Sequence, residues 1–107
     1  MSILFVLTSH ATLGDTGRET GLWLEEFLTP YYSFVDAGLP VRLCSPLGGN
    51  APVDPASVEA LKGHPLYQRY QSDLILVERL NGTAQLSYKA ARHKNTTNKL
   101  MAYSMGA

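Results

Sequence analysis

Two adjacent carboxylates, Glu25 and Glu26, occupy positions that indicate chemistry in this chain of 107 residues. On a helix with about 100° per residue, Glu25 falls on a polar strip, whereas Glu26 falls among Leu22, Trp23 and Pro30. A carboxyl group held against apolar surface is desolvated, and such a group is a candidate general acid or base. Glu26 is therefore the candidate catalytic residue. The alternative is a glutamate at the flank of a helix, whose stem packs and whose carboxylate reaches water.

The other residues with reactive or ligating side chains are scattered. Cys44 is the single cysteine of the sequence, which excludes an internal disulfide and a multi-cysteine zinc site. It lies in an apolar segment, where a free cysteine packs as a small hydrophobe. No two of the three histidines, His10, His64 and His93, have the spacing of metal ligands. The glycines of residues 14–21 lack the order of a dinucleotide-binding loop, so the sequence predicts neither a metal nor a cofactor.

The elements that must position Glu26 can be predicted from the apolar pattern. Residues 3–7 form a short apolar run that is typical of a strand covered on both faces, as in a parallel sheet. Residues 21–38 have the apolar spacing of a helix of roughly 16 residues, closed by Gly38, with an alternative early start at Thr16. Pro30 interrupts the hydrogen bonds of this helix and leaves the carbonyl of Glu26 without its usual donor. Residues 39–46 then form a second strand, which completes a βαβ unit and an α/β fold.

Shorter helices are expected in the next segment. Asp54 followed by Pro55 indicates a helix start, and Gly63 indicates its end. His64 is interpreted as a loop residue. A further short helix is capped by Ser72 or Asp73 and closes at residues 81–82.

The charges are divided unevenly along a chain whose net charge is zero. Residues 1–79 carry a net charge of −4, and residues 80–107 carry four bases and no acid. These bases lack interleaved aromatic residues, so a solvated basic tail is the preferred interpretation and nucleic-acid binding the weaker alternative. No apolar run approaches the about 18 residues of a membrane span, and the N-terminal segment lacks the pattern of a secretory signal. We therefore expect a cytoplasmic protein with no membrane or nucleic-acid partner.

Six short motifs follow one another along the first half of the chain: Leu-Thr-Ser-His at 7–10, Gly-Asp-Thr-Gly at 14–17, Thr-Gly-Leu-Trp-Leu-Glu-Glu at 20–26, Pro-Tyr at 30–31, Asp-Ala-Gly at 36–38 and Cys-Ser-Pro-Leu-Gly-Gly at 44–49. Together they resemble the PfpI-like superfamily of class I glutamine amidotransferase-like proteins, which includes the Parkinson-associated deglycase and the glyoxalase III or chaperone branch. The resemblance covers residues 1 to about 87 and implies the N-terminal βαβ portion of a flavodoxin-like, doubly wound parallel sheet. It also implies that Glu26 is the glutamate of the first helix that hydrogen-bonds the catalytic cysteine.

The sequence departs from the family after this region. The family's Gly-Gly-His-Gly loop and its strand-to-helix elbow with a catalytic Cys-His pair are absent from the 107 residues. Cys44 aligns with the second strand and is not that cysteine. The resemblance thus implies a truncated or frameshifted member, with residues 1–87 as the N-terminal part of the α/β domain and residues 88–107 as a basic, irregular tail.

The functional expectations follow from this departure. The family's glyoxalase III-type, deglycase or hydrolase chemistry acts on 2-oxoaldehydes, but a chain without the nucleophile is expected to be inactive. A 2-oxoaldehyde substrate is expected only where the site is completed. The alternative is a non-enzymatic binding or chaperone-like α/β fragment. Because the first strand and most of the long helix are apolar, and because the first strand would have an open edge that can pair with another chain, self-association is also expected.

Overall fold

The sheet contains four strands in the computed structural model, which describes residues 2–12, 17–86 and 102–105. They are β1 (Ile3–Leu7), β2 (Val41–Ser45), β3 (Ala84–Gln85) and β4 (Ala102–Met105). Their order is β3-β2-β1-β4, and all neighbouring strands are parallel. The predicted α/β class and βαβ unit are confirmed, and the arrangement is that of the N-terminal portion of a flavodoxin-like sheet.

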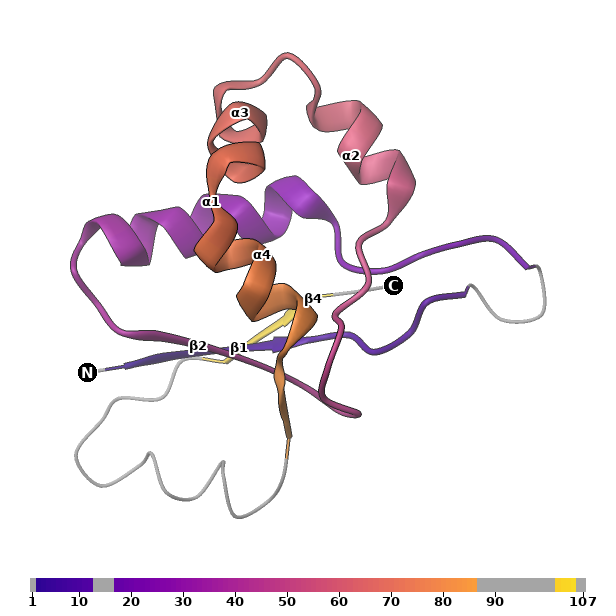
Figure 1. Cartoon of the computed structure of the whole chain (residues 1–107), viewed down its shortest axis with the longest axis horizontal. Coiled ribbons are helices and arrows are strands. Elements are labelled where there is room, and N and C mark those ends of the chain that lie inside the picture. Colours follow the sequence, from indigo (N-terminus) through magenta and orange to yellow (C-terminus); the bar gives the residue numbers. More distant parts are fainter. Residues whose placement is uncertain (1, 13–16, 87–101, 106–107) are drawn as a thin grey trace.

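Four helices lie on one side of this sheet in the described part of the chain (Figure 1). They are α1 (Leu24–Asp36), α2 (Pro55–Leu61), α3 (Pro65–Ser72) and α4 (Leu74–Asn81). Ile3, Phe5 and Leu7 of β1 point towards the helices and are fully buried. Phe5 packs edge-to-face on Phe27, with ring centroids 5.4 Å apart. This side of the sheet carries the hydrophobic core.

The opposite face of β1 is less well covered. Leu4 and Val6 alternate with the buried residues and are only half-buried. The prediction that the first strand is covered on both faces therefore holds fully for the helical side and only in part for the other side. The expectation of an open edge on β1 is wrong, because β1 pairs with β2 on one side and with β4 on the other.

The long helix is shorter than expected. It spans 13 residues, and Trp23 is its N-cap without a side-chain hydrogen bond. An early start at Thr16 is wrong because residues 17–23 are not helical; Thr16 itself lies outside the described residues. The end is as predicted, since Gly38 follows the C-cap with φ +77°, a conformation that glycine adopts without steric cost. Tyr32, which lies seven residues after Glu25 and therefore on the same predicted polar strip, is only 3 % exposed.

The caps of the short helices explain which of them could be predicted. The Asp54 carboxylate accepts the Ala56 N–H at 2.9 Å and starts α2, and Asp73 accepts the Leu76 N–H at 3.0 Å and starts α4. Both starts are confirmed, with Asp73 rather than Ser72 as the cap of α4.

Helix α3 was not predicted. His64 is its N-cap, and its Nδ1 atom accepts the Leu66 N–H at 3.1 Å. His64 itself lies outside the helix, as predicted for a loop residue. The segment has no buried residue, and its apolar pattern was too weak to indicate a helix.

The C-terminal strands were also missed. β3 is two residues long, and β4 lies within the segment expected to be an irregular tail, an expectation that does not hold for Ala102–Met105. Residues 88–101 and 106–107 of that segment lie outside the described residues. Within the described chain, no helix has the length and apolar character needed to cross a membrane.

Candidate functional site

The loops that follow β1 and β2 meet at the carboxyl edge of the sheet, where open α/β proteins bind ligands. The Ser9 hydroxyl accepts the Leu47 N–H at 3.0 Å and ties the two loops together. Within the first loop, the Thr8 hydroxyl accepts the His10 N–H at 3.0 Å. The two loops at the carboxyl edge are therefore held together by Ser9.

The segment before α1 is held against residues 52–54. The Leu22 N–H donates to the Pro52 carbonyl at 2.9 Å, and the Asp54 N–H donates to the Leu22 carbonyl at 3.0 Å. The Thr20 hydroxyl adds a 3.3 Å bond to the Asp54 carboxylate. A Cβ atom on Gly21 would lie 2.3 Å from the Pro52 oxygen, so only glycine allows this close approach. These contacts fix the direction in which the first turn of α1 begins.

Glu26 lies in that first turn, but its environment differs from the expected one. Both Glu25 and Glu26 are exposed, and Glu26 makes no hydrogen bond or ion pair with the described residues. Of the apolar neighbours that were to cover its carboxylate, Leu22 is fully buried, but Trp23 is 37 % exposed and Pro30 is half-buried. The expectation that Glu26 is held against apolar surface is wrong, and its candidate role depends on the family resemblance.

Cys44 occupies the interior of β2, as the sequence indicated. It is 4 % exposed, and its thiol lies 3.5 Å from the Phe5 carbonyl oxygen, which accepts its hydrogen bond. Burial raises the pKa of the Cys44 thiol, and the nearby Arg42 guanidinium offsets only part of this effect. A buried thiol that donates to a main-chain carbonyl has the properties of a packing residue.

An open hollow of about 270 Å³ near the carboxyl edge is lined by Ala11, Glu19, Thr20, Asn50, Pro52 and Val53. Neither Glu26 nor Cys44 belongs to this set. Among the residues that the structure describes, no three histidine, cysteine, aspartate or glutamate side chains are grouped to hold a metal ion.

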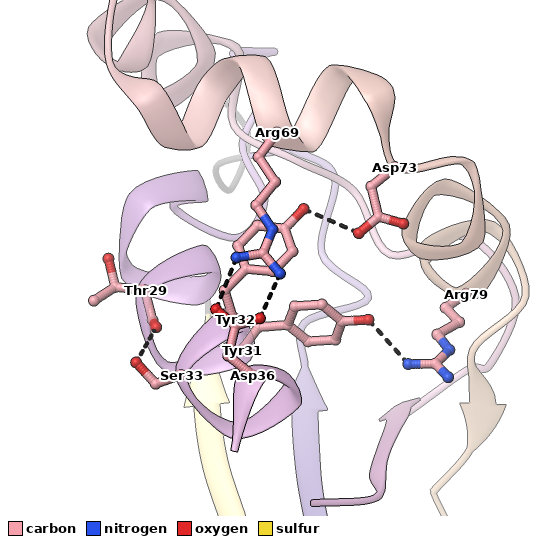
Figure 2. A network of polar contacts seen from close by, with 8 residues as sticks. All are labelled: Thr29, Tyr31, Tyr32, Ser33, Asp36, Arg69, Asp73 and Arg79. Atoms are coloured by element: carbon pink, nitrogen blue, oxygen red, sulfur yellow. Dashed lines mark hydrogen bonds and ion pairs between the residues drawn. The ribbon is translucent and has the colours of Figure 1, made fainter. Parts of the chain in front are cut away.

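A separate polar network joins α1 to α3 and α4 (Figure 2). The Tyr32 hydroxyl donates to Asp73 at 3.1 Å, while Arg69 forms a two-pronged ion pair with Asp36 at 2.9 and 2.6 Å. The Arg69 guanidinium also lies 3.8 Å from the centroid of the Tyr32 ring. Burial and the Asp73 carboxylate both raise the pKa of Tyr32.

A neighbouring contact completes this network. Arg79 of α4 donates to the Tyr31 hydroxyl at 2.9 Å (Figure 2). Burial raises the pKa of Tyr31, and the Arg79 charge offsets part of the rise. The partners are 33 to 48 residues apart in sequence, so no local pattern could have predicted them. The network braces the helical layer.

Comparison with known proteins identifies structural relatives. No protein-family model and no curated protein matches the chain. The X-ray structure of the 24 kDa rapid encystment protein REP24 of Francisella tularensis is similar over 79 % of this chain, with 32 % identity and a TM-score of 0.69. A crystal structure designated APC35852 is similar over 85 % of this chain, with 38 % identity and a TM-score of 0.64. The matched region is only 37 % and 38 % of these two larger chains, respectively.

Proposed function

We propose that this chain is an N-terminal portion of a PfpI-like α/β protein and that its own residues do not perform the family's chemistry on 2-oxoaldehydes. The observation that carries the proposal is the burial of Cys44. A nucleophilic cysteine needs an accessible thiolate and a base within hydrogen-bond reach. Cys44 is buried, its pKa is raised, and its thiol donates to the Phe5 main-chain carbonyl.

The position of Glu26 supports a role in a site completed by further residues. It lies in the first turn of α1, next in space to a loop segment that is fixed by hydrogen bonds at Leu22. Its carboxylate is exposed and has no hydrogen-bond or ion-pair partner among the described residues. A cysteine supplied by a further segment of chain could therefore contact it. In such a site Glu26 would accept a proton from the thiol or return it to the substrate oxygen.

The first experiment measures turnover of the purified 107-residue chain. Methylglyoxal is supplied without glutathione, and lactate is measured. We expect no lactate above the buffer control, and we expect the Cys44→Ala and Glu26→Gln variants to give the same result. Lactate formation that disappears in Cys44→Ala would contradict the proposal.

The accessibility of the thiol can be measured independently. We expect iodoacetamide to alkylate Cys44 in the native chain at least about tenfold more slowly than in denaturant, because burial and a raised pKa both suppress the thiolate. Equal rates in the two states would place Cys44 at the surface and remove the main support for the proposal.

A second candidate is a non-enzymatic, chaperone-like role. Leu74 and Ile75 at the start of α4 are 74 % and 65 % exposed, and Leu47 beside the carboxyl edge is 76 % exposed. Exposed apolar side chains can hold an unfolding client protein. A light-scattering assay with a heat-denatured client enzyme tests this. The chain should delay aggregation, and a Leu74→Ser, Ile75→Ser double variant should lose the delay. An equal delay with both chains would contradict this role.

A further inference from the structure

The outer edge of β2 is only partly covered. β1 pairs with β2 over Val41 to Cys44, whereas β3 pairs with only Cys44 and Ser45. β3 cannot extend further towards its N-terminus, because α4 ends just before it. Gly82 is the C-cap of α4, and its N–H donates to the Glu78 carbonyl. The first half of β2 therefore lacks a strand on its outer side in the described part of the chain.

The hydrogen-bond pattern shows which main-chain groups face this edge. The Ile3 N–H donates to the Pro40 carbonyl, so the N–H and C=O of Arg42 point towards β1 in the parallel ladder. Those of Val41 and Leu43 then point outwards. The pairing of Ala84 with Cys44 uses the Leu43 carbonyl, and it leaves the Val41 N–H, the Val41 C=O and the Leu43 N–H at the edge.

An open hollow lies beside these groups. It has a volume of about 190 Å³ and is lined by Val41, Arg42, Leu43, Arg79, Gly82 and Ala84. Arg42 and Arg79 are both exposed, and no acidic residue belongs to the lining. Arg79 uses one of its donors on Tyr31, which leaves the rest of its guanidinium for another partner. The edge thus combines strand-pairing groups with two positive charges.

We propose that this edge of β2 binds an acidic, extended peptide segment by strand addition. A peptide residue opposite Arg42 donates its N–H to the Val41 carbonyl and accepts the Leu43 N–H with its own carbonyl. An acidic side chain at this peptide residue lies on the same face of the sheet as Arg42, and an acidic side chain at the next position lies on the helical face, where it can pair with Arg79.

The main-chain groups favour a peptide over a free anion. Phosphate has oxygen acceptors for the arginines and for the Leu43 N–H, but at neutral pH it offers little to the Val41 carbonyl, which requires a donor. A second copy of this chain would bring its own β2 edge with Arg42 and Arg79 against the same two arginines, which is unfavourable. An acidic strand satisfies the donors, the acceptor and the charges together.

The test uses the full chain and a fluorescein-labelled hexapeptide of sequence Val-Glu-Glu-Val-Glu-Glu, which places glutamates on both faces of the added strand. Fluorescence anisotropy measures binding, and amide NMR should show slower hydrogen exchange at Leu43 when the peptide is bound. Arg42→Gln is expected to weaken binding about fivefold, the factor that corresponds to about 1 kcal/mol for an exposed ion pair. Lys62→Gln on α2's C-cap is the matched control and should leave binding unchanged.

Two peptide variants separate strand pairing from charge. A hexapeptide N-methylated at alternate residues keeps its charges and loses its donors, so it should bind at least about tenfold more weakly. A peptide with lysine in place of glutamate should not bind. The proposal is overturned if the methylated peptide binds as well as the parent, if inorganic phosphate at equal concentration displaces the peptide, if the chain instead self-associates through this edge, or if no peptide binds.

Discussion

Glu25 and Glu26 both lie in the first turn of α1, where the helix dipole favours negative charge. Because both are exposed, we expect Glu26→Gln and Glu25→Gln to lower the free energy of unfolding by similar small amounts, about 0.5 kcal/mol each. Urea unfolding at low salt measures the loss, which 1 M salt should reduce. Glu78→Gln near the end of α4 is the control and should not destabilise. A Glu26→Gln variant that is more stable than the unmodified chain would show that the carboxylate is desolvated.

At the residue scale, the sequence was informative about Cys44 and misleading about Glu26. The apolar residues around Cys44 in its strand indicated a packed position, and Cys44 is indeed only 4 % exposed. The burial of Glu26 depended on its neighbours, and Trp23 and Pro30 turned out to be partly exposed. A helical wheel shows which residues share a side of the helix, but it does not show which side packs against the rest of the protein.

The approach of residues 20–22 to Pro52 makes Gly21 a sensitive position among the connecting elements. A methyl group there would lie 2.3 Å from the Pro52 oxygen and 2.7 Å from the Val53 nitrogen. We expect Gly21→Ala to lower the free energy of unfolding by about 1 to 3 kcal/mol, as overpacking does in general.

Urea unfolding of Gly21→Ala should be compared with Gly82→Ala. The added Cβ of Gly82→Ala would approach the Glu78 carbonyl no closer than 3.4 Å, so that change should stay within about 0.5 kcal/mol. If the two substitutions cost the same, the contact between residues 21 and 52 is not tight.

The hydrogen bond from Tyr32 of α1 to Asp73, the N-cap of α4, predicts how the free energy of unfolding changes at alkaline pH. The pKa of Tyr32 is raised in the native state, so the unfolded chain loses its proton first and stability falls as the pH rises above about 10. Tyr32→Phe should cost about 1 kcal/mol at pH 7, because the bond to Asp73 is lost. It should also make the decline between pH 10 and 11.5 less steep.

Urea unfolding at pH 7, 10 and 11.5 measures both effects. Asp36→Asn is the control: it breaks the exposed ion pair with Arg69 and should leave the alkaline decline unchanged. A decline equally steep in Tyr32→Phe would mean that Tyr32 is not protected in the native state.

Among the helices, those with strong local signals were predictable. Aspartate caps indicated α2 and α4, and Gly38 indicated the end of α1, because each satisfies main-chain groups with a nearby residue. Helix α3 has a histidine cap and no buried residue, so neither its start nor its periodicity was distinctive. Its position depends on Arg69 contacting Asp36 and Tyr32, which are distant in sequence.

For the molecule as a whole, self-association remains a prediction, now assigned to one surface. Leu4 and Val6 are half-buried on the sheet face opposite the four helices. Threonine keeps a strand propensity while lowering apolarity, so Leu4→Thr with Val6→Thr should shift the chain towards monomer at micromolar concentration. Light scattering after gel filtration measures the mass.

Ile75→Ser on α4 is the control, since it lowers apolarity on the helical side. A single monomeric species for the unmodified chain would contradict the prediction.

The sheet order itself was only half predictable. A βαβ unit places β1 beside β2 by proximity in the chain, but it does not say which segment pairs with the other edge of β1. That partner, β4, follows a basic segment without apolar periodicity, and its two-residue counterpart β3 is too short to give a pattern.

The pairing of β1 with β4 has a consequence for the time during which the chain is synthesised. About 95 residues separate Leu7 from Ala102, and ribosomes add roughly 5 to 20 residues per second. Once β1 has left the ribosome, one of its edges therefore waits about 5 to 20 s for its partner strand. That interval is far longer than the microseconds in which a local hairpin closes. During each round of translation, β1 is therefore paired with β2 but not yet with β4 for several seconds. In this interval, its free edge would be the binding site for holdase chaperones on the nascent chain.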